Sequence, residues 1–296
     1  MRIVSLVPHA TELLFALGLG DDVVGVTHEC DFPEPATRLP QVTRDVLPAG
    51  LTAGEIDAAV RERTQTGEAI YALDERLLHA LEPDLIVTQE LCPVCAVSYE
   101  EVEEVARTIP SCPKVIALDP KTFGETMGDI RTVAQATSSR DAALDLVARQ
   151  RARVDQVKIA VKDAPRRAVA AIEWFDPVYV AGHWTPQLVE LAGGIDVLGF
   201  AGERSERTDW ETVAAARPEV VLCIPCGYDG PRAAEEAERF ADRLRDVGAR
   251  EVVALDAAAY FSRPGPRLVD GLETLAHALH PDLVPEAPGV VHRIEL

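Results

Sequence analysis

The second half of this 296-residue sequence repeats the plan of the first half. Residues 12–26 and residues 187–200 each read as an amphipathic helix, a glycine stop and a short β-branched strand. Residues 81–89 and 216–224 follow in the same order, each with a helix end, a proline next to an acidic residue and a buried strand. The repeat predicts two similar α/β lobes. Clefts between domains are favoured sites for small ligands, so the repeat indicates a binding protein.

The length and the net charge of the chain limit the classes of protein to which it can belong. A chain of 296 residues exceeds the usual size of a single core and fits two lobes. The net charge of −20 excludes nucleic acid and anionic membrane as main partners, because both bind basic surfaces. The acidic residues are dispersed, as in residues 99–104, which is typical of a solvated surface.

The N-terminus predicts a cytoplasmic protein. Residues 2–7 are apolar for only a few positions before Pro8, which is too short for the apolar region of a signal peptide. No stretch approaches the length of a membrane span, so no membrane insertion is expected. In a reducing compartment, the six cysteines are expected to be thiols or metal ligands rather than disulfides. A start codon upstream of Met1 would instead give a periplasmic or extracellular protein.

The pattern along the chain predicts parallel βαβ units. Short β-branched runs alternate with helical patterns, which is typical of parallel sheets covered by helices. The predicted strands of the first half are residues 2–6, 23–26, 84–88 and 114–117. Residues 123–161 are helical with one break near Ser138. The part after the break has no Gly or Pro and a single apolar stripe, which predicts one long, stiff helix.

We therefore predict an α/β fold of two Rossmann-like lobes with parallel sheets, joined by one long helix. The expected N-terminal lobe is residues 1–138, the connecting helix residues 139–164, and the C-terminal lobe residues 165–296. Ligands of open α/β sheets bind beyond the carboxyl ends of the strands. We therefore expect binding residues in the loops that follow the strands.

Two of the three Trp, three of the seven His and four of the six Cys residues fall in these loops. Trp offers a flat face suited to a corrin or another planar ring, and an imidazole can contact a metal or donate a hydrogen bond. Trp184 has an alternative role, which is packing into its lobe at the start of the next helix. The predicted ligand-binding residues are Pro8, His9, Glu29, Trp174, Asp176, His183, Trp184, Tyr228, Tyr260 and Arg263.

A second set of loop residues has the chemistry of metal ligands. Cys92 and Cys95 form a CxxC loop before a helix that Ser98 begins, and a helix N-terminus favours thiolate. The alternative is that these thiols are small buried residues that pack the loops, as expected for Cys112 and Cys223. The predicted ligands of zinc or of an iron-sulfur cluster are His28, Cys30, Cys92, Cys95 and Cys226.

Three segments carry a family resemblance: residues 5–18 (SLVPHATELLFALG), 24–33 (VGVTHECDFP) and 263–271 (RPGPRLVDG). They resemble the vitamin B12-binding members of the periplasmic binding protein family, in its TroA-like, helical-backbone class III that also carries iron-siderophores. The resemblance covers essentially the whole chain, including the long helix. It implies a two-lobed fold with modest hinge motion and a ligand held between the lobes.

Two features depart from that family. Its usual members are exported and hand their ligand to a membrane transporter, whereas this chain lacks an export signal. Its B12 binders do not require thiols, whereas the loops of this chain are rich in them. The departures are the reason for keeping an intracellular protein with a Cys/His site as the alternative.

The sequence favours binding over catalysis, because it has no G-x-S-x-G elbow, P-loop or H-E-x-x-H motif. We predict non-catalytic binding of a corrinoid (cobalamin-like) or a related metal chelate between the lobes, by a substrate-binding component or an intracellular carrier. A small molecule is the expected partner, joined by an ABC transporter permease if the protein is exported. The alternative is an intracellular metal or iron-sulfur protein whose Cys/His site supports catalysis.

Overall fold

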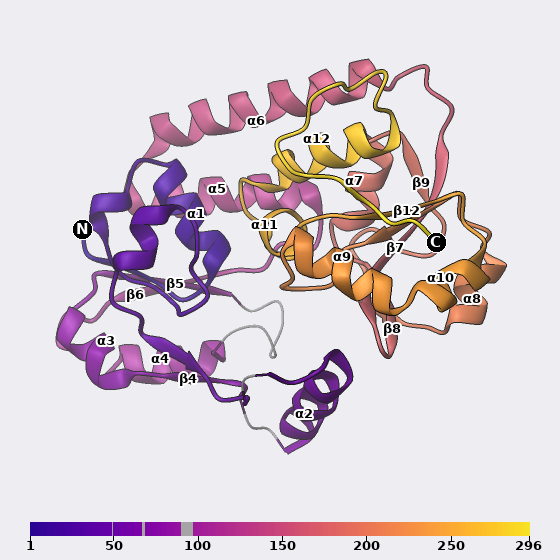
Figure 1. The fold of residues 1–296 in the computed structure, drawn as a ribbon. Coiled ribbons are helices and arrows are strands. Elements are labelled where there is room, and N and C mark those ends of the chain that lie inside the picture. The colour runs from indigo at the N-terminus through magenta and orange to yellow at the C-terminus, as the bar shows by residue number, and fades with distance from the viewer. Residues whose placement is uncertain (49, 67–68, 90–96) are drawn as a thin grey trace. The chain divides into compact units, whose positions relative to one another are not determined.

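The computed structural model describes residues 1–48, 50–66, 69–89 and 97–296. Its contacts divide the chain into two compact units, both drawn in Figure 1. Unit 1 contains Met1–Pro120 and Met127–Val147, and unit 2 contains Lys121–Thr126 and Ala148–Leu296. Each unit has its own sheet and its own helices, so the predicted α/β fold is confirmed.

A parallel sheet forms the centre of unit 1. In this sheet β1 (Ile3–Ser5) lies between β2 (Val23–Gly25) and β5 (Leu85–Gln89), and β6 (Lys114–Leu118) pairs with the other side of β5. All these pairings are parallel. The carboxyl ends of the strands therefore share one edge of the sheet, and the loops that follow them meet there.

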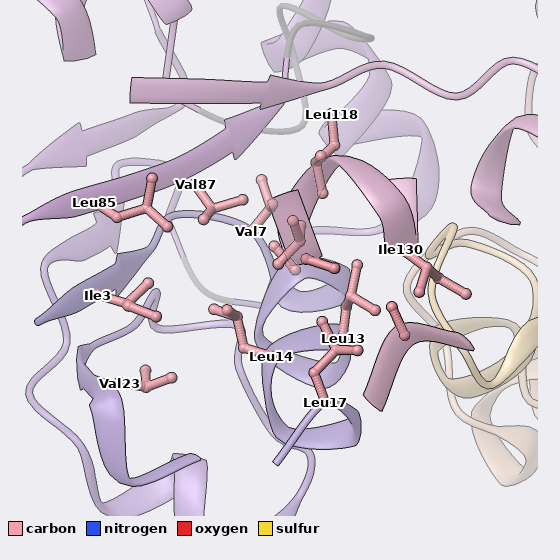
Figure 2. Packing of buried hydrophobic residues seen from close by; sticks show 14 of the residues in the cluster. Ile3, Val7, Leu13, Leu14, Leu17, Val23, Leu85, Val87, Leu118 and Ile130 are labelled. Atoms are coloured by element: carbon pink, nitrogen blue, oxygen red, sulfur yellow. The ribbon is translucent and has the colours of Figure 1, made fainter. Parts of the chain in front are cut away.

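Both faces of this sheet are buried, which explains why its strands read as continuous apolar runs. On one face, Leu14 of α1 (Pro8–Ala16) belongs to the same buried cluster as Ile3, and Figure 2 shows these side chains together. On the opposite face, Val4 and Ile86 belong to a second buried cluster. Polar groups are thus left to the ends of the strands.

Local signals set the bounds of the helices in unit 1. The carboxylate of Asp74 accepts a hydrogen bond from the Leu77 N–H and begins α3 (Glu75–Leu81), and Ser98 begins α4 (Tyr99–Ala106) in the same way. The other elements are the 3-10 helices Gly20–Asp22 and Glu34–Arg38, α2 (Ala53–Thr66), α5 (Phe123–Thr137), β3 (Thr43–Asp45) and β4 (Tyr71–Leu73). Strands β3 and β4 form a separate antiparallel pair, which we call the ribbon.

The sheet of unit 2 has a parallel centre and antiparallel edges. The parallel strands are β7 (Arg167–Phe175), β9 (Gly194–Asp196), β11 (Val220–Cys223) and β12 (Glu251–Ala254). The antiparallel strands are β8 (Val178–Val180), β10 (Glu206–Arg207) and β13 (His292–Arg293). The short strands β8, β10 and β13 give no pattern that indicates their direction, which is why the sequence indicates only parallel pairing.

Helices cover the sheet of unit 2. They are α6 (Arg140–Ala160), whose last part belongs to this unit, α7 (Thr185–Leu191), α8 (Trp210–Ala215), α9 (Gly230–Arg239), α10 (Ala241–Val247), α11 (Ala257–Tyr260) and α12 (Leu268–Leu279). The long helix predicted between the two halves is α6. Within the described residues, no helix has both the length and the apolar character that a membrane span requires.

Arg153 joins α6 to α12 within unit 2. Its Nε donates to Glu273 Oε1 at 2.9 Å and its Nη2 donates to Glu273 Oε2 at 2.6 Å, with a further bond to Asp270. One turn earlier, Gln150 Nε2 donates to the carbonyl oxygen of Pro266 at 3.1 Å. The hydrogen bonds to Glu273 raise the pKa of the Arg153 guanidinium. These contacts hold α12 against the second half of α6.

We predict that Arg153→Met lowers the free energy of unfolding of unit 2 by about 1–3 kcal/mol, because two half-buried carboxylates lose their partner. Urea unfolding followed by circular dichroism measures the change. Arg107→Gln breaks an exposed pair with Glu103 and serves as the control, with an expected effect below about 0.5 kcal/mol. Equal effects of the two substitutions would contradict the prediction.

Candidate functional site

Pro8 and His9 follow β1 and form the first turn of α1. A proline is favoured there because the first N–H groups of a helix have no partner within it. Both side chains are buried, and His9 is only 3% exposed. They form part of the interior of unit 1 at the carboxyl edge of its sheet, and their contact with a ligand stays a prediction.

His28 and Glu29 follow β2 and are held by two side chains of the ribbon. His28 Nδ1 lies 2.8 Å from Thr43 Oγ1, and the Tyr71 hydroxyl donates to Glu29 Oε1 at 2.9 Å. The rings of His28 and Tyr71 meet edge to face with centroids 5.1 Å apart. We call these four residues the polar cluster. Thr43 and Tyr71 carry no sequence signal, because nothing in the pattern indicates that the ribbon folds back onto the loop after β2.

Cys30 lies in the core of unit 1 rather than on its surface. Its side chain is 3% exposed, and its Sγ is 3.1 Å from Thr11 Oγ1 and 3.3 Å from Thr27 Oγ1. Thr11 Oγ1 in turn donates to Ser5 Oγ at 2.8 Å. The thiol is therefore part of a buried hydroxyl network at the end of β1.

The described residues do not assemble the predicted zinc or iron-sulfur site. Across residues 1–48, 50–66, 69–89 and 97–296, no group of three or more His, Cys, Asp or Glu side chains is placed to hold a metal ion. Cys92 and Cys95 lie outside the described residues, and Cys226 is an exposed thiol of unit 2. Metal binding by the cysteines therefore stays a prediction.

In unit 2, aromatic side chains gather at the carboxyl end of β7. Trp174 of β7 pairs directly with Tyr179 of β8, so the two side chains share one face of the sheet. The Trp174 ring also meets the edge of Tyr228, which follows β11, with centroids 5.8 Å apart. We call Trp174, Tyr179 and Tyr228 the aromatic row. Tyr179 was not predicted because a three-residue strand gives no indication of which face it presents.

Arginine side chains flank the aromatic row. Arg207 of β10 pairs directly with Tyr179, and the guanidinium carbon of Arg232 lies 3.7 Å from the centroid of the Tyr228 ring. Such cation–π contact orients a guanidinium that is otherwise exposed. The indole Nε1 of Trp174 is buried and has no hydrogen-bond partner among the residues that the structure describes. Buried N–H groups are rarely left without an acceptor, so this atom suits a ligand that carries one.

His183 sits in a tight turn held by the segment after β9. Its φ is +53°, its N–H donates to the Glu203 carbonyl at 2.6 Å, and its carbonyl accepts from Gly202 N–H at 2.9 Å. The preceding Gly182 has no room for a side chain, since a Cβ there would lie 2.5 Å from the Glu203 carbonyl oxygen. The backbone thus fixes the position of the half-buried His183 ring.

Trp184 packs into unit 2. It is 5% exposed, and its Nε1 donates to the Phe261 carbonyl at 2.7 Å. Of the two roles predicted for Trp184, the structure shows the packing into its lobe, and contact with a ligand stays a prediction. Strand β8 precedes Trp184 and is antiparallel to β7. Residues 181–183 run back along β7, where Ala181 N–H donates to the Ala171 carbonyl at 2.9 Å.

The remaining predicted residues lie around the loops after β7, β11 and β12. Asp176 is exposed at the β7–β8 turn, and Cys226 is tied to β7 by a hydrogen bond from its N–H to the Glu173 carbonyl at 3.0 Å. Tyr260 ends α11, where burial and the nearby Asp270 raise its pKa. Arg263 is half-buried in the next loop.

Two exposed phenylalanines in the loops were missed. Phe200 is 67% exposed on the segment that holds His183, and Phe32 is 44% exposed on the loop after β2. Single exposed apolar side chains are common on protein surfaces, so a role of either phenylalanine in ligand contact stays a prediction. Each lies outside any strand or helix pattern, so only its exposure in the folded chain distinguishes it from a core residue.

Comparison with known proteins gives consistent matches over nearly the whole chain. The family described as "Periplasmic binding protein" matches residues 3–251. An uncharacterized ABC transporter substrate-binding lipoprotein, YvrC of Bacillus subtilis, is 23% identical over 96% of this chain and 82% of its own length. A vitamin B12-binding protein of Vibrio cholerae is 24% identical over 92% of this chain and 86% of its own length.

Among solved structures, the apo form of the periplasmic heme-binding protein RhuT from Roseiflexus sp. RS-1 shares this fold. The two chains superpose with a TM-score of 0.67 at 24% identity, over 96% of this chain and 98% of that one. The relatives thus include proteins named for two different metal chelates. The likeness to the solved structure shows the fold.

We predict that Gly182→Ala destabilises unit 2 by roughly 1–3 kcal/mol, because its Cβ would overlap the Glu203 backbone. Thermal unfolding measures the loss. Gly128→Ala is the matched control: it lies inside α5 with no other atom within 4 Å of the new Cβ, and is expected to stabilise by about 0.5–1 kcal/mol. A neutral Gly182→Ala would show that the segment around residue 203 does not pack on this turn.

Thiol alkylation should distinguish exposed from buried cysteines among the residues that the structure describes. Cys112 and Cys226 are exposed and are expected to react with iodoacetamide in the folded protein. Burial raises the pKa of the Cys223 thiol, so Cys223 should react only after denaturation. Mass spectrometry of the labelled peptides measures the extent of alkylation at each cysteine. Labelling of folded Cys223 as fast as Cys112 would contradict the placement of β11 in the core.

Proposed function

The chain belongs to the periplasmic binding protein family, and we propose that it binds a corrinoid as the substrate-binding component of an ABC transport system. A small-molecule ligand follows from the family. The corrinoid and the transporter permease partner are the proposal. It draws on relatives named for vitamin B12 binding and for ABC transport.

The aromatic row is the observation that carries the proposal. A corrin is a nearly flat ring with apolar faces and a rim of polar side groups. Flat aromatic side chains match such a face and lose little entropy on binding. The Trp174 ring packs edge to face with the ring of Tyr228, which is buried in the core of unit 2, so the Trp174 ring has a defined position before a ligand arrives. Preorganised contacts of this kind favour affinity.

The polar atoms beside the aromatic row suit the rim of the same ligand. Corrin side groups are amides, whose carbonyl oxygens accept hydrogen bonds. Arg232 is stacked on Tyr228 and exposed, so it can donate to carbonyl or phosphate oxygens. An apolar face with a few placed polar groups is the usual composition of a cofactor site.

We predict that dicyanocobinamide binds the pure protein saturably and that Trp174→Leu weakens binding tenfold or more, because one stacked ring accounts for about 1.4 kcal/mol or more. Absorbance titration or calorimetry measures Kd. Trp210→Leu is the control: Trp210 packs with Phe175 and Phe240 inside unit 2, so it should lower stability and leave Kd within about twofold. Absence of saturable binding to the wild-type protein would overturn the proposal.

A further inference from the structure

The end of α6 and the turn after it carry half of the lysines of this chain. The whole sequence has four lysines, which are Lys114, Lys121, Lys158 and Lys162. Lys158 lies in the last turn of α6, and Lys162 lies in the turn that follows. Arg166 comes directly before β7. Three cations are thus spaced at intervals of four residues, in a chain whose net charge is −20.

These three cations line a pocket of unit 2. The pocket has a volume of about 420 Å³, which is within the usual range of small-molecule sites. Its walls come from the end of α6 with the turn after it, from the first turn of α5 and from α7. All of its lining residues belong to unit 2. We call this space the basic pocket.

The basic pocket lies at the opposite edge of the sheet from the aromatic row. Arg166 and Gly193 both line it, and they come directly before the parallel strands β7 and β9. The amino ends of parallel strands share one edge of a sheet. Trp174 lies seven residues after Arg167 in β7, which is roughly 23 Å along an extended strand. The basic pocket is therefore separate from the site proposed for the corrinoid.

Hydrogen bonds and close packing fix the walls of the basic pocket. Phe123 N–H donates to Gln187 Oε1 at 2.7 Å, which joins the start of α5 to α7. Gly193 has no room for a side chain, because a Cβ there would lie 2.7 Å from Nε2 of the buried His280. A pocket with fixed walls costs a ligand little ordering free energy.

The basic pocket combines a buried apolar part with an exposed cationic part. Phe123 and Val161 line it and are only 9% and 7% exposed. Its three cations are exposed. Among the described residues that line the pocket, Glu190 has the only carboxylate. Three cations and one carboxylate give the lining a formal net charge of +2, opposite in sign to the charge of the whole chain.

The three cations are available to an external anion. Lys158 Nζ lies 3.7 Å from Asp155 Oδ1, and both side chains are more than half exposed, so this pair contributes little free energy. Neither Lys162 nor Arg166 pairs with a carboxylate in the described part of the chain. At physiological ionic strength the Debye length is about 8 Å, so acidic residues elsewhere on the surface are largely screened from an anion in the pocket.

A phosphate monoester matches this charge better than a carboxylate does. Such a phosphate carries a charge of about −1.5 to −2 at pH 7, whereas a carboxylate carries a single charge. Lysine binds phosphate as a point charge, and the arginine fork can donate two hydrogen bonds to it. The Oε1 atom of Gln187 is already used by Phe123 N–H, so the remaining amide atom, Nε2, is a further donor in the lining.

We propose that the basic pocket binds a small phosphate monoester with an apolar part. The phosphate lies among Lys158, Lys162 and Arg166, and the apolar part lies against Phe123 and Val161. This second site goes beyond the proposed function and does not depend on it, because the two sites lie at opposite edges of the sheet.

Phenyl phosphate, inorganic phosphate and benzoate test the site by calorimetric titration of the full chain. We expect phenyl phosphate to bind saturably and at least about threefold tighter than the other two, because inorganic phosphate lacks the ring and benzoate lacks the second charge. Lys162→Gln and Arg166→Gln should each weaken it about fivefold or more. Lys114→Gln is the matched control: Lys114 is an exposed lysine of unit 1, and its loss should change Kd by less than about twofold.

Lysine labelling locates the bound anion and distinguishes its sources. Phenyl phosphate should slow the reductive methylation of Lys158 and Lys162 and leave that of Lys114 unchanged, as measured by mass spectrometry. AMP should give the same protection, because it also joins a phosphate to a flat ring. Vesicles of phosphatidylcholine and phosphatidic acid should give none, because the acidic surface of the chain repels an anionic membrane.

Several results would overturn the assignment. Absence of saturable phenyl phosphate binding excludes the site, and equal weakening by Lys114→Gln and Lys162→Gln shows a general charge effect instead. Benzoate binding as tight as that of phenyl phosphate contradicts the phosphate, and protection by the vesicles without protection by AMP contradicts a free small molecule. Trp174→Leu should leave the Kd of phenyl phosphate within about twofold, whether or not a corrinoid binds. Weakening by this variant would place the phosphate at the aromatic row. Circular dichroism melting confirms that folded variants are compared.

Discussion

Parallel pairing with both sheet faces covered is the constraint on which the rest of each unit depends. In unit 1, Ile3 and Val4 point into different buried clusters on the two faces of one strand. A buried polar side chain on such a strand costs free energy unless it has a partner, so most polar groups collect where the strands end. The polar cluster follows β2, and the aromatic row stands at the end of β7 and β11.

The fold could be predicted from the sequence because the patterns of its main strands and helices are either long or clearly bounded. The strands β1 and β5 each begin with an apolar, β-branched run, and Ser98 and the uninterrupted residues of α6 mark helices clearly. The site could be predicted only in part. Glu29 was identified because it follows β2, and Trp174 because it lies at the carboxyl end of β7. Tyr71 and Tyr179 were missed because each belongs to a three-residue strand whose partner is set by tertiary packing.

The thiols show why residue type alone gives an incomplete prediction. Cys30 and Cys226 have the same chemistry and similar positions after strands, yet Cys30 is enclosed by hydroxyl groups and Cys226 is open to solvent. The difference comes from Thr11 and Thr27, whose side chains close over one thiol. No spacing of cysteines in the sequence encodes that enclosure, because it depends on neighbours from other elements.

The hydrogen bond from Trp184 to the Phe261 carbonyl has a mechanical consequence for unit 2. It links the first turn of α7 to the chain just after α11, across a separation of 77 residues. Because the indole is buried and its partner is backbone, the two segments cannot shift independently without breaking the bond. The turn that holds His183 and the loop that carries Arg263 therefore behave as one rigid part. A ligand that displaces either the His183 turn or the Arg263 loop must therefore also move the other segment or break this hydrogen bond.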